Sequence, residues 1–132
     1  MGSPHPPTGV DTEIIAAHIV DAAYHFHTAL GPGLLESVYE VCLAYELRKR
    51  GLDVRTQLQL AIRYDEIEVE AGLRIDMVVG DLVIVELKAV EALLPLHDAQ
   101  LLTYLKLSGF RLGILINFNV PRIKNGIKRV IL

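Results

Sequence analysis

The chain has 132 residues, the size of a single domain, and its apolar fraction of 52% excludes an intrinsically disordered protein. The net charge of −3 does not indicate a nucleic-acid-binding protein, but it hides an uneven distribution. Residues 1–98 hold seven Lys and Arg against all 16 Asp and Glu, whereas residues 99–132 hold six Lys and Arg and no acid. The C-terminal part therefore forms either a local basic surface or a solvated basic tail.

The sequence also excludes several classes of protein. No apolar run approaches the roughly 20 residues that span a bilayer, so no membrane contact is expected. The single cysteine, Cys42, excludes an internal disulfide framework and favours a reducing, cytoplasmic compartment. Residues 1–11 lack the features of a secretory signal. We expect them to be a disordered tail or a cloning remnant, followed by a single domain over residues 12–132.

Two helices are predicted at the start of the domain. Asp11 or Thr12 is placed to cap the first helix. Ile15, His18, Ile19, Ala22 and Phe26 recur at helical spacing and form one stripe along this helix. The Gly31-Pro32-Gly33 segment then breaks the chain. The second helix runs from about Leu35 to Arg50, and Gly51 suits the left-handed conformation that ends a helix.

Strands follow, because the apolar pattern changes to a period of two residues. Two alternating strands, 54–64 and 67–75, flank a tight turn at Asp65-Glu66. The apolar run 82–88 is typical of a central strand buried on both faces. The remaining predicted elements are a helix over 95–108, a buried strand over 110–118 and a terminal hairpin with its turn at Asn125-Gly126. This order predicts an α/β protein with a mixed central β-sheet flanked by helices.

The central strand contains two charged residues on one face. Glu86 and Lys88 are two positions apart, and burying them is costly unless they are paired or bind an ion. Asp76 interrupts an earlier apolar stretch in the same way. An Asp, a Glu and a Lys that converge on one patch of sheet indicate a Mg²⁺ site, since hard cations prefer carboxylate oxygens. The alternative is a structural Glu–Lys pair at a sheet edge.

The spacing of these residues tests the metal site. A two-residue turn at Gly80-Asp81 would pair Asp76 with Val85 and would place Asp76 and Glu86 on opposite faces. A shared site therefore requires a three-residue loop, a bulge or a sharp bend at Asp76. Gly80 can supply the positive φ that such a loop needs.

Two helices offer further polar groups. Gln100 and Tyr104 share one face of the helix over 95–108, either to contact phosphate and water or as a boundary between core and solvent. Glu36 opens the second helix, either as a third carboxylate beside the metal or through its favourable interaction with the helix dipole. His18, His25 and His27 do not predict a transition-metal site, because no cysteine or acidic motif completes one.

Several motifs together resemble one protein family, the GxxExxY proteins, which are assigned to the PD-(D/E)XK nuclease-like superfamily. The resemblance covers about residues 12–132. The matching segments, in chain order, are Gly33-x-x-Glu36-x-x-Tyr39, Arg74-Ile75-Asp76, Val85-Glu86-Leu87-Lys88, His97-Asp98-Ala99-Gln100-Leu101-Leu102-Thr103-Tyr104 and Gly113-Ile114-Leu115-Ile116-Asn117-Phe118.

The resemblance implies a PD-(D/E)XK nuclease-like core in α-β-β-β-α-β order. It implies a metal held by Asp76, Glu86 and the backbone carbonyl of Leu87, with Lys88 as the motif lysine and Glu36 as the glutamate of the helix. Gln100 and Tyr104 look like the Q-x-x-x-Y motif of RecB-type members. The sequence departs from the superfamily name at one position, because Ile75 rather than proline precedes Asp76.

We therefore expect a Mg²⁺- or Mn²⁺-dependent nuclease that hydrolyses phosphodiester bonds of DNA or RNA, with DNA favoured. Lys124, Lys128 and Arg129 are the candidate contacts to the nucleic-acid backbone. The small size predicts a homodimer or a protein partner. The alternative is a catalytically inactive nuclease-fold module that binds nucleic acid or protein. A third possibility is hydrolysis of a small phosphoester.

Overall fold

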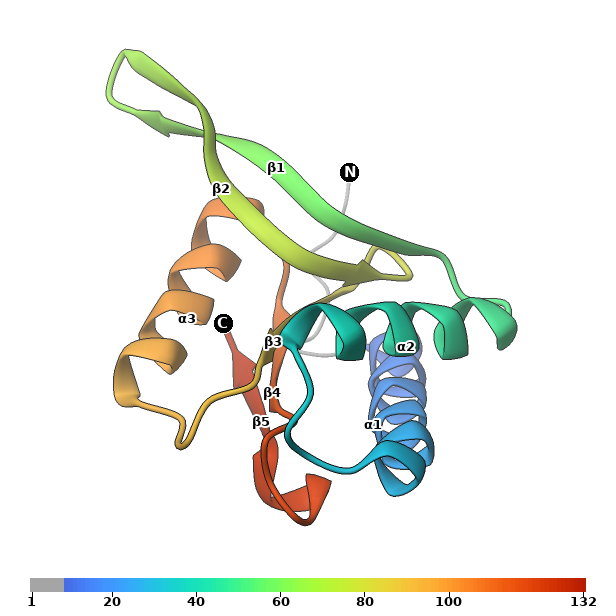
Figure 1. Cartoon of the computed structure of the whole chain (residues 1–132). Helices are drawn as coiled ribbons and strands as arrows, with labels where there is room; N and C mark the ends of the chain where they lie inside the picture. The colour runs from blue at the N-terminus through green and yellow to red at the C-terminus, as the bar shows by residue number, and fades with distance from the viewer. Residues whose placement is uncertain (1–8) are drawn as a thin grey trace.

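The computed structural model describes residues 9–132 of the chain as a central sheet with helices on both faces (Figure 1). The helices and strands are, in chain order, α1 (Val10–Leu30), α2 (Glu36–Lys49), β1 (Val54–Tyr64), β2 (Ile67–Val79), β3 (Val83–Lys88), α3 (Pro95–Ser108), β4 (Leu112–Asn117), the 3₁₀ helix η1 (Ile123–Gly126) and β5 (Ile127–Ile131).

The five strands lie in chain order across the sheet, β1-β2-β3-β4-β5. β3 and β4 are parallel, and all other neighbouring strands are antiparallel. Because parallel neighbours need a crossover connection, α3 links β3 to β4 across one face of the sheet. The predicted α/β architecture, a mixed sheet flanked by helices, is confirmed.

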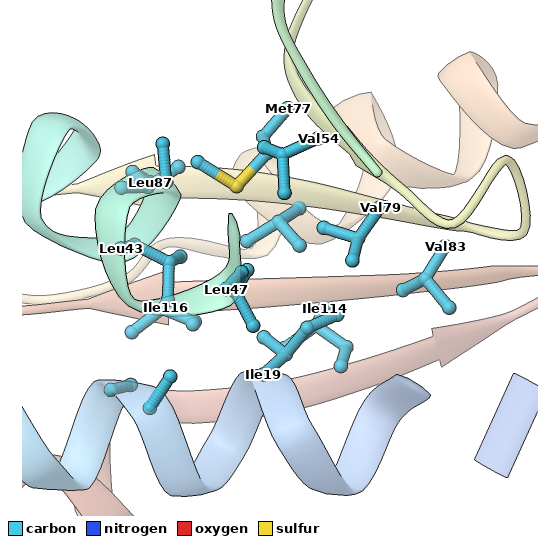
Figure 2. Packing of buried hydrophobic residues seen from close by; sticks show 14 of the residues in the cluster. Ile19, Leu43, Leu47, Val54, Met77, Val79, Val83, Leu87, Ile114 and Ile116 are labelled. Carbon is cyan, nitrogen blue, oxygen red and sulfur yellow. The ribbon is translucent and has the colours of Figure 1, made fainter. Parts of the chain in front are cut away.

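Two apolar clusters hold the layers together. The larger one packs α1 and α2 on the sheet, and Figure 2 shows Ile19, Leu43 and Leu47 of these helices facing sheet residues such as Met77 of β2 and Ile114 of β4. The smaller cluster packs Leu101 and Leu105 of α3 on the opposite face. The strands β3 and β4 are covered from both sides, which explains their nearly continuous apolar sequence.

Most predicted bounds agree with the structure to within two residues, but the strand predicted over 67–75 continues to Val79, so Asp76 lies inside it. The helix over 95–108 and the strand over 54–64 have the predicted limits, and Asp65-Glu66 forms the turn that pairs Tyr64 with Ile67. The predicted cap of the first helix is wrong, because α1 begins at Val10 after Gly9 and Asp11 and Thr12 lie in its first turn. The helix also overlaps the tail predicted over residues 1–11, of which residues 1–8 lie outside the described part.

The hairpin turn predicted at Asn125-Gly126 is wrong. These two residues belong to η1, and β5 pairs with β4 through a connection that covers residues 118–126. The physical reason is a close approach of two backbones: a Cβ built at Gly126 would lie 2.1 Å from the carbonyl oxygen of Asn117. The glycine is therefore needed for packing of η1 against the end of β4 and not for a type I′ turn.

The hairpin of β1 and β2 extends beyond the body of the sheet as an arm (Figure 1). Its register shifts between Leu60 and Ile62, where β2 contains extra residues that include Ala71 with a positive φ of 51°. Such a bulge increases the local twist of a strand pair. The arm therefore leaves the region covered by α3 as a separate twisted ribbon.

Candidate active site

The connection between β2 and β3 brings Asp76 and Glu86 opposite each other. Val79 pairs with Val83, so the loop contains three residues, with positive φ values of 60° at Gly80 and 55° at Asp81. Met77 and Val85 are the last pair of this ladder, so Asp76 and Glu86 follow directly after it, one on each strand. Of the arrangements that a shared site requires, the chain thus adopts the three-residue loop, and β2 also bends at Asp76, as described below.

The carboxylates of Asp76 and Glu86 are fixed by backbone amides of the opposite strand. The N–H of Asp76 donates to Glu86 Oε2 over 2.9 Å, and the N–H of Leu87 donates to Asp76 Oδ2 over 3.0 Å. Both residues are buried, at 8% and 5% exposure. The paired backbone of β2 and β3 ends one step earlier, at Met77 and Val85. Beyond that pair, the carboxylates of Glu86 and Asp76 accept the hydrogen bonds that backbone carbonyls would accept in a continuing strand pair.

β2 also changes its orientation at Asp76. Ile75 packs into the α3 cluster and Met77 into the α1–α2 cluster, although strict alternation would place both on one face. On β1, the pairing with β2 skips Gln57, which has a positive φ of 52° and lies between the partners of Ile75 and Met77. This irregularity lies next to the candidate site. Strand irregularities are common beside active sites, where they change the direction of a functional side chain.

Burial and charge act together on Glu86. Its pKa is raised to about 8, first by burial and second by the neighbouring negative charge of Asp76. The amide of Asp76 and the ammonium group of Lys88 oppose this rise but do not cancel it. The site therefore holds two carboxyl groups that resist being charged together, and an added cation would relieve their repulsion.

α2 places Glu36 at the edge of this pair. The pKa of Glu36 is raised by partial burial and then by the charge of Asp76, while Lys88 lowers it. Glu36 is the first residue of α2, whose start is fixed by the hydroxyl of buried Tyr39. This hydroxyl donates to the carbonyl of Gly31 over 2.7 Å and accepts from the N–H of Leu34 over 3.1 Å. The spacing of Glu36 and Tyr39 thus joins a site residue to the residue that orders its loop.

α3 brings Gln100 and Tyr104 to the other side. The amide of Gln100 donates to the hydroxyl of Tyr104 over 3.0 Å. The pKa of Tyr104 is raised by burial and then by the charges of Glu86 and Asp76, which places the phenol near both carboxylates. The structure therefore fixes Asp76 and Glu86 next to each other, with Glu36, Lys88 and Tyr104 near enough to act on them electrostatically and Gln100 bonded to Tyr104. Within the described part of the chain, Glu36 does not form a three-carboxylate cluster with Asp76 and Glu86.

Sequence reasoning did not single out Arg74. Its side chain is exposed on β2, and its charge lowers the pKa of both Glu36 of α2 and Tyr104 of α3. It forms no ion pair within residues 9–132. The signal available in the sequence was a lone arginine two positions before Asp76, in a strand whose other charged residues are acids.

Asn117 was missed as well, although it orders the chain directly after Lys88. Its side chain is 2% exposed, accepts from the N–H groups of Val90 (3.0 Å) and Asn119 (3.2 Å) and donates to the carbonyl of Val90 (2.9 Å). The carbonyl of Lys88 accepts from the N–H of Phe118 over 2.9 Å. The signal for Asn117 was a polar residue inside the apolar run of its strand.

The three cations predicted to bind nucleic acid do not share one face of the sheet. Lys128 lies opposite Leu115 and pairs with Asp98 of α3, whereas Arg129 lies opposite Ile114 and pairs with Glu13 of α1 through two bonds of 2.8 and 2.9 Å. Leu115 and Ile114 belong to the clusters on opposite faces. Lys124 is exposed on η1. The basic C-terminal part is therefore divided between surfaces.

The donor set fits Mg²⁺ or Mn²⁺ better than a transition metal with a closed cage. Within residues 9–132, no three His, Cys, Asp or Glu side chains cluster closely enough to enclose an ion. His27 is buried and bonded to the carbonyl of Phe118 (3.0 Å), and His18 faces Arg50. Asp76 and Glu86 supply two hard oxygen donors, which matches Mg²⁺ because this ion keeps waters and needs only one or two protein carboxylates.

Comparisons with known proteins agree with this arrangement. None of the helices in the described region is both long and apolar enough to cross a membrane. Neither the curated proteins nor the solved structures contain a match to the chain. A family model described as the PD-(D/E)XK nuclease superfamily matches residues 13–130, nearly the whole chain. The chain therefore belongs to the PD-(D/E)XK nuclease superfamily.

Proposed function

We propose that the chain is a metal-dependent nuclease of the GxxExxY group that hydrolyses phosphodiester bonds of DNA or RNA. The observation that carries the proposal is the pair of buried carboxylates, Asp76 and Glu86, each fixed by an amide of the opposite strand beside Lys88. Membership of a nuclease superfamily supports a nucleic-acid substrate. A fold alone does not define an activity, so the proposal depends on this site.

Asp76, Glu86 and the backbone carbonyl of Leu87 would hold Mg²⁺ or Mn²⁺. When bound, such an ion polarises a phosphoryl oxygen and lowers the pKa of a coordinated water. The hydrogen bonds to Asp76 and Glu86 order both side chains in advance, so little side-chain entropy is lost when they engage a ligand.

Lys88 contributes a positive charge next to the carboxylates. It follows Glu86 by two positions on β3, and its charge acts on both Glu86 and Glu36. A half-buried ammonium group in this position stabilises negative charge that develops on the phosphate and orients the attacking water by hydrogen bonds. Asn117 supports this role, because it fixes the segment that begins directly after Lys88.

The flanking helices would orient water and substrate. Glu36 can accept a hydrogen bond from a water at the edge of the site, since its carboxylate lies near Asp76 and Lys88. The bonded pair of Gln100 and Tyr104 offers an amide and a hydroxyl to a phosphate or to Lys88. These groups act on the position of the reacting phosphate and not on its sequence context.

Arg74 would bind the nucleic-acid backbone next to the reacting phosphate. An unpaired, exposed guanidinium can donate two parallel hydrogen bonds to a phosphate. Lys124 remains the best placed of the three predicted C-terminal contacts. Lys128 and Arg129 would have to exchange Asp98 and Glu13 for phosphates, which lowers their net contribution.

A cleavage assay tests the proposal. Labelled single- and double-stranded DNA and RNA are incubated at low salt with Mg²⁺, Mn²⁺ or EDTA, with the wild type, Lys88→Ala and the matched control Lys49→Ala on the exposed end of α2. Metal-dependent cleavage by the wild type and Lys49→Ala, but not by Lys88→Ala, is expected. Equal cleavage by all three proteins would contradict the site. Binding without cleavage of any substrate would favour the inactive nuclease-fold module.

A further inference from the structure

The distal arm (residues 61–71 of β1 and β2) has one apolar face without a cover. Ile62 pairs with Val69 and Tyr64 with Ile67, and residues that pair across a hairpin point to the same side. Tyr64 is 73% exposed, Ile67 58% and Val69 45%. The cover ends at Ile62, because Leu58, Leu60 and Ile62 of the same face still pack against the α3 cluster.

The other groups of the distal arm give it a negative charge. Asp65, Glu66, Glu68 and Glu70 accompany a single cation, Arg63. None of the four acids forms an ion pair with a residue between 9 and 132. Glu68 and Glu70 alternate with Ile67 and Val69 and so point to the other side of the arm, whereas Asp65 and Glu66 form the turn at the tip of the apolar face. An apolar face that ends in an acidic tip suits a partner surface that is apolar with a basic group at one end, and it is unsuited to a nucleic-acid backbone.

The chain itself carries a surface of that kind beside the base of the arm. The C-terminal end of α3 lies below the point where the arm leaves the body (Figure 1), next to Leu105, which packs in the same cluster as Leu58 and Leu60. Leu107 is 45% exposed there, and Lys106 is exposed and makes no ion pair within the described residues. Leu107 and Lys106 together are named the α3 end.

The face of the arm, and not its edge, is suited to association. β1 is an edge strand of the sheet and carries the charged residues Arg55 and Arg63. Its regular geometry is interrupted by the positive φ of Gln57 and by the register shift after Leu60. Charged side chains and bulges on an edge strand oppose the addition of another strand. The open apolar face has no comparable obstacle.

We propose that a second copy of this chain covers the distal arm in a two-fold symmetric dimer. The two arms pack face to face in opposite directions, so each tip reaches the α3 end of the partner. This direction keeps the acidic tips apart and brings Asp65 and Glu66 to the partner subunit's Lys106. A two-fold axis makes both contacts at once with the same surface, as an isologous interface requires.

Sedimentation velocity over a concentration series tests the dimer. The wild type is expected to reach twice the mass of the chain, and Ile67→Asp to raise the dissociation constant at least about tenfold, equivalent to about 1.4 kcal/mol. The matched control is Val41→Asp, because Val41 of α2 is exposed by 68%, against 58% for Ile67, and lies outside the proposed interface. It should dimerise as the wild type does. Circular dichroism confirms that each variant is folded.

A charge exchange tests the direction of the arms. Lys106→Glu should weaken the dimer, and adding Glu66→Lys to it should restore association, because the two charges are merely exchanged. A wild type that stays monomeric at all concentrations would overturn the proposal. So would an Ile67→Asp variant that associates as tightly as Val41→Asp. A double variant no tighter than Lys106→Glu would overturn the opposed arrangement. None of these outcomes depends on nuclease activity.

Discussion

The amide of Asp76 donates to the carboxylate of Glu86 over 2.9 Å, while the carboxylate of Asp76 accepts from the next residue on β3, Leu87, over 3.0 Å. Each strand thus orders the acid of the other. This reciprocal arrangement places two buried carboxyl groups next to each other. The electrostatic cost of that arrangement has consequences for stability that can be measured.

Without added metal, the stability of the protein is expected to decrease as the pH rises from about 4.5 to 8. The folded state raises the pKa of Glu86 to about 8, through burial and the charge of Asp76, so it binds the proton more tightly than the unfolded chain does. The contribution of Glu86 to the free energy of unfolding is fully present below the pKa of this group in the unfolded chain. It is lost as the pH rises through the pKa of Glu86 in the folded protein. The groups that face it are Asp76, Glu36, Lys88 and Tyr104.

Urea unfolding in EDTA at several pH values measures this effect. Between pH 4.5 and 8, the free energy of unfolding of the wild type should fall by a few kcal/mol relative to that of Glu86→Gln. The reason is that the glutamine side chain does not ionise. Glu91→Gln, an exposed acid on the loop before α3, is the control and should follow the wild type. Parallel pH curves for the wild type and Glu86→Gln would show that Glu86 is not responsible.

A divalent cation should reverse the loss of stability. Binding to the folded state alone raises the melting temperature with cation concentration, since two carboxylates gain a shared counter-charge. Mg²⁺ or Mn²⁺ at pH 8 is expected to stabilise the wild type and to have a much smaller effect on Asp76→Asn, with Asp81→Asn as the exposed control. An equal thermal shift in all three proteins would place the cation elsewhere.

Much of this site followed from the sequence because the chemistry limited the geometry. Asp76 and Glu86 had to share a face, which required an odd loop between β2 and β3, and the loop has three residues. The flanking positions Glu36 and Tyr104 followed from the family resemblance and from helical spacing. The bounds of α3 were set by Pro95 at its start and by Gly109, which is left-handed, after its end.

The incorrect or missing parts involve contacts between residues far apart in the chain. Asn125-Gly126 has the local signature of a hairpin turn, but the carbonyl of Asn117 occupies the space that a side chain at Gly126 would need. The surface of Lys128 and Arg129 is divided because Asp98 and Glu13, from two different helices, attract them. Periodicity describes one element at a time and contains no information on such partners.

Asn117→Ala is expected to destabilise the protein by about 2–4 kcal/mol, since it leaves buried backbone groups of Val90 and Asn119 without partners. The control is Asn125→Ala on the exposed part of η1. Cleavage measured well below the melting temperature should also fall, because the segment after Lys88 loses its anchor. A drop in stability with unchanged cleavage would restrict Asn117 to a structural role.

Arg74→Gln is expected to weaken nucleic-acid binding without preventing the chemical step. The variant removes one phosphate contact. The slope of the logarithm of the binding constant against the logarithm of the salt concentration should therefore become shallower by about 1. Its KM should therefore rise while kcat changes little, in contrast to Lys88→Ala, for which kcat should fall about 10²–10³-fold.

Arg63→Gln is the matched control, because this arginine lies on the arm at a distance from the carboxylate pair along the same two strands. Fluorescence anisotropy over a salt series measures the binding constant alone when each substitution is made in the non-cleaving Lys88→Ala variant. If Arg74→Gln and Arg63→Gln have the same salt slope as their common background, Arg74 does not contact phosphate. A loss of kcat with an unchanged KM would instead assign the guanidinium to the reacting phosphate in the transition state.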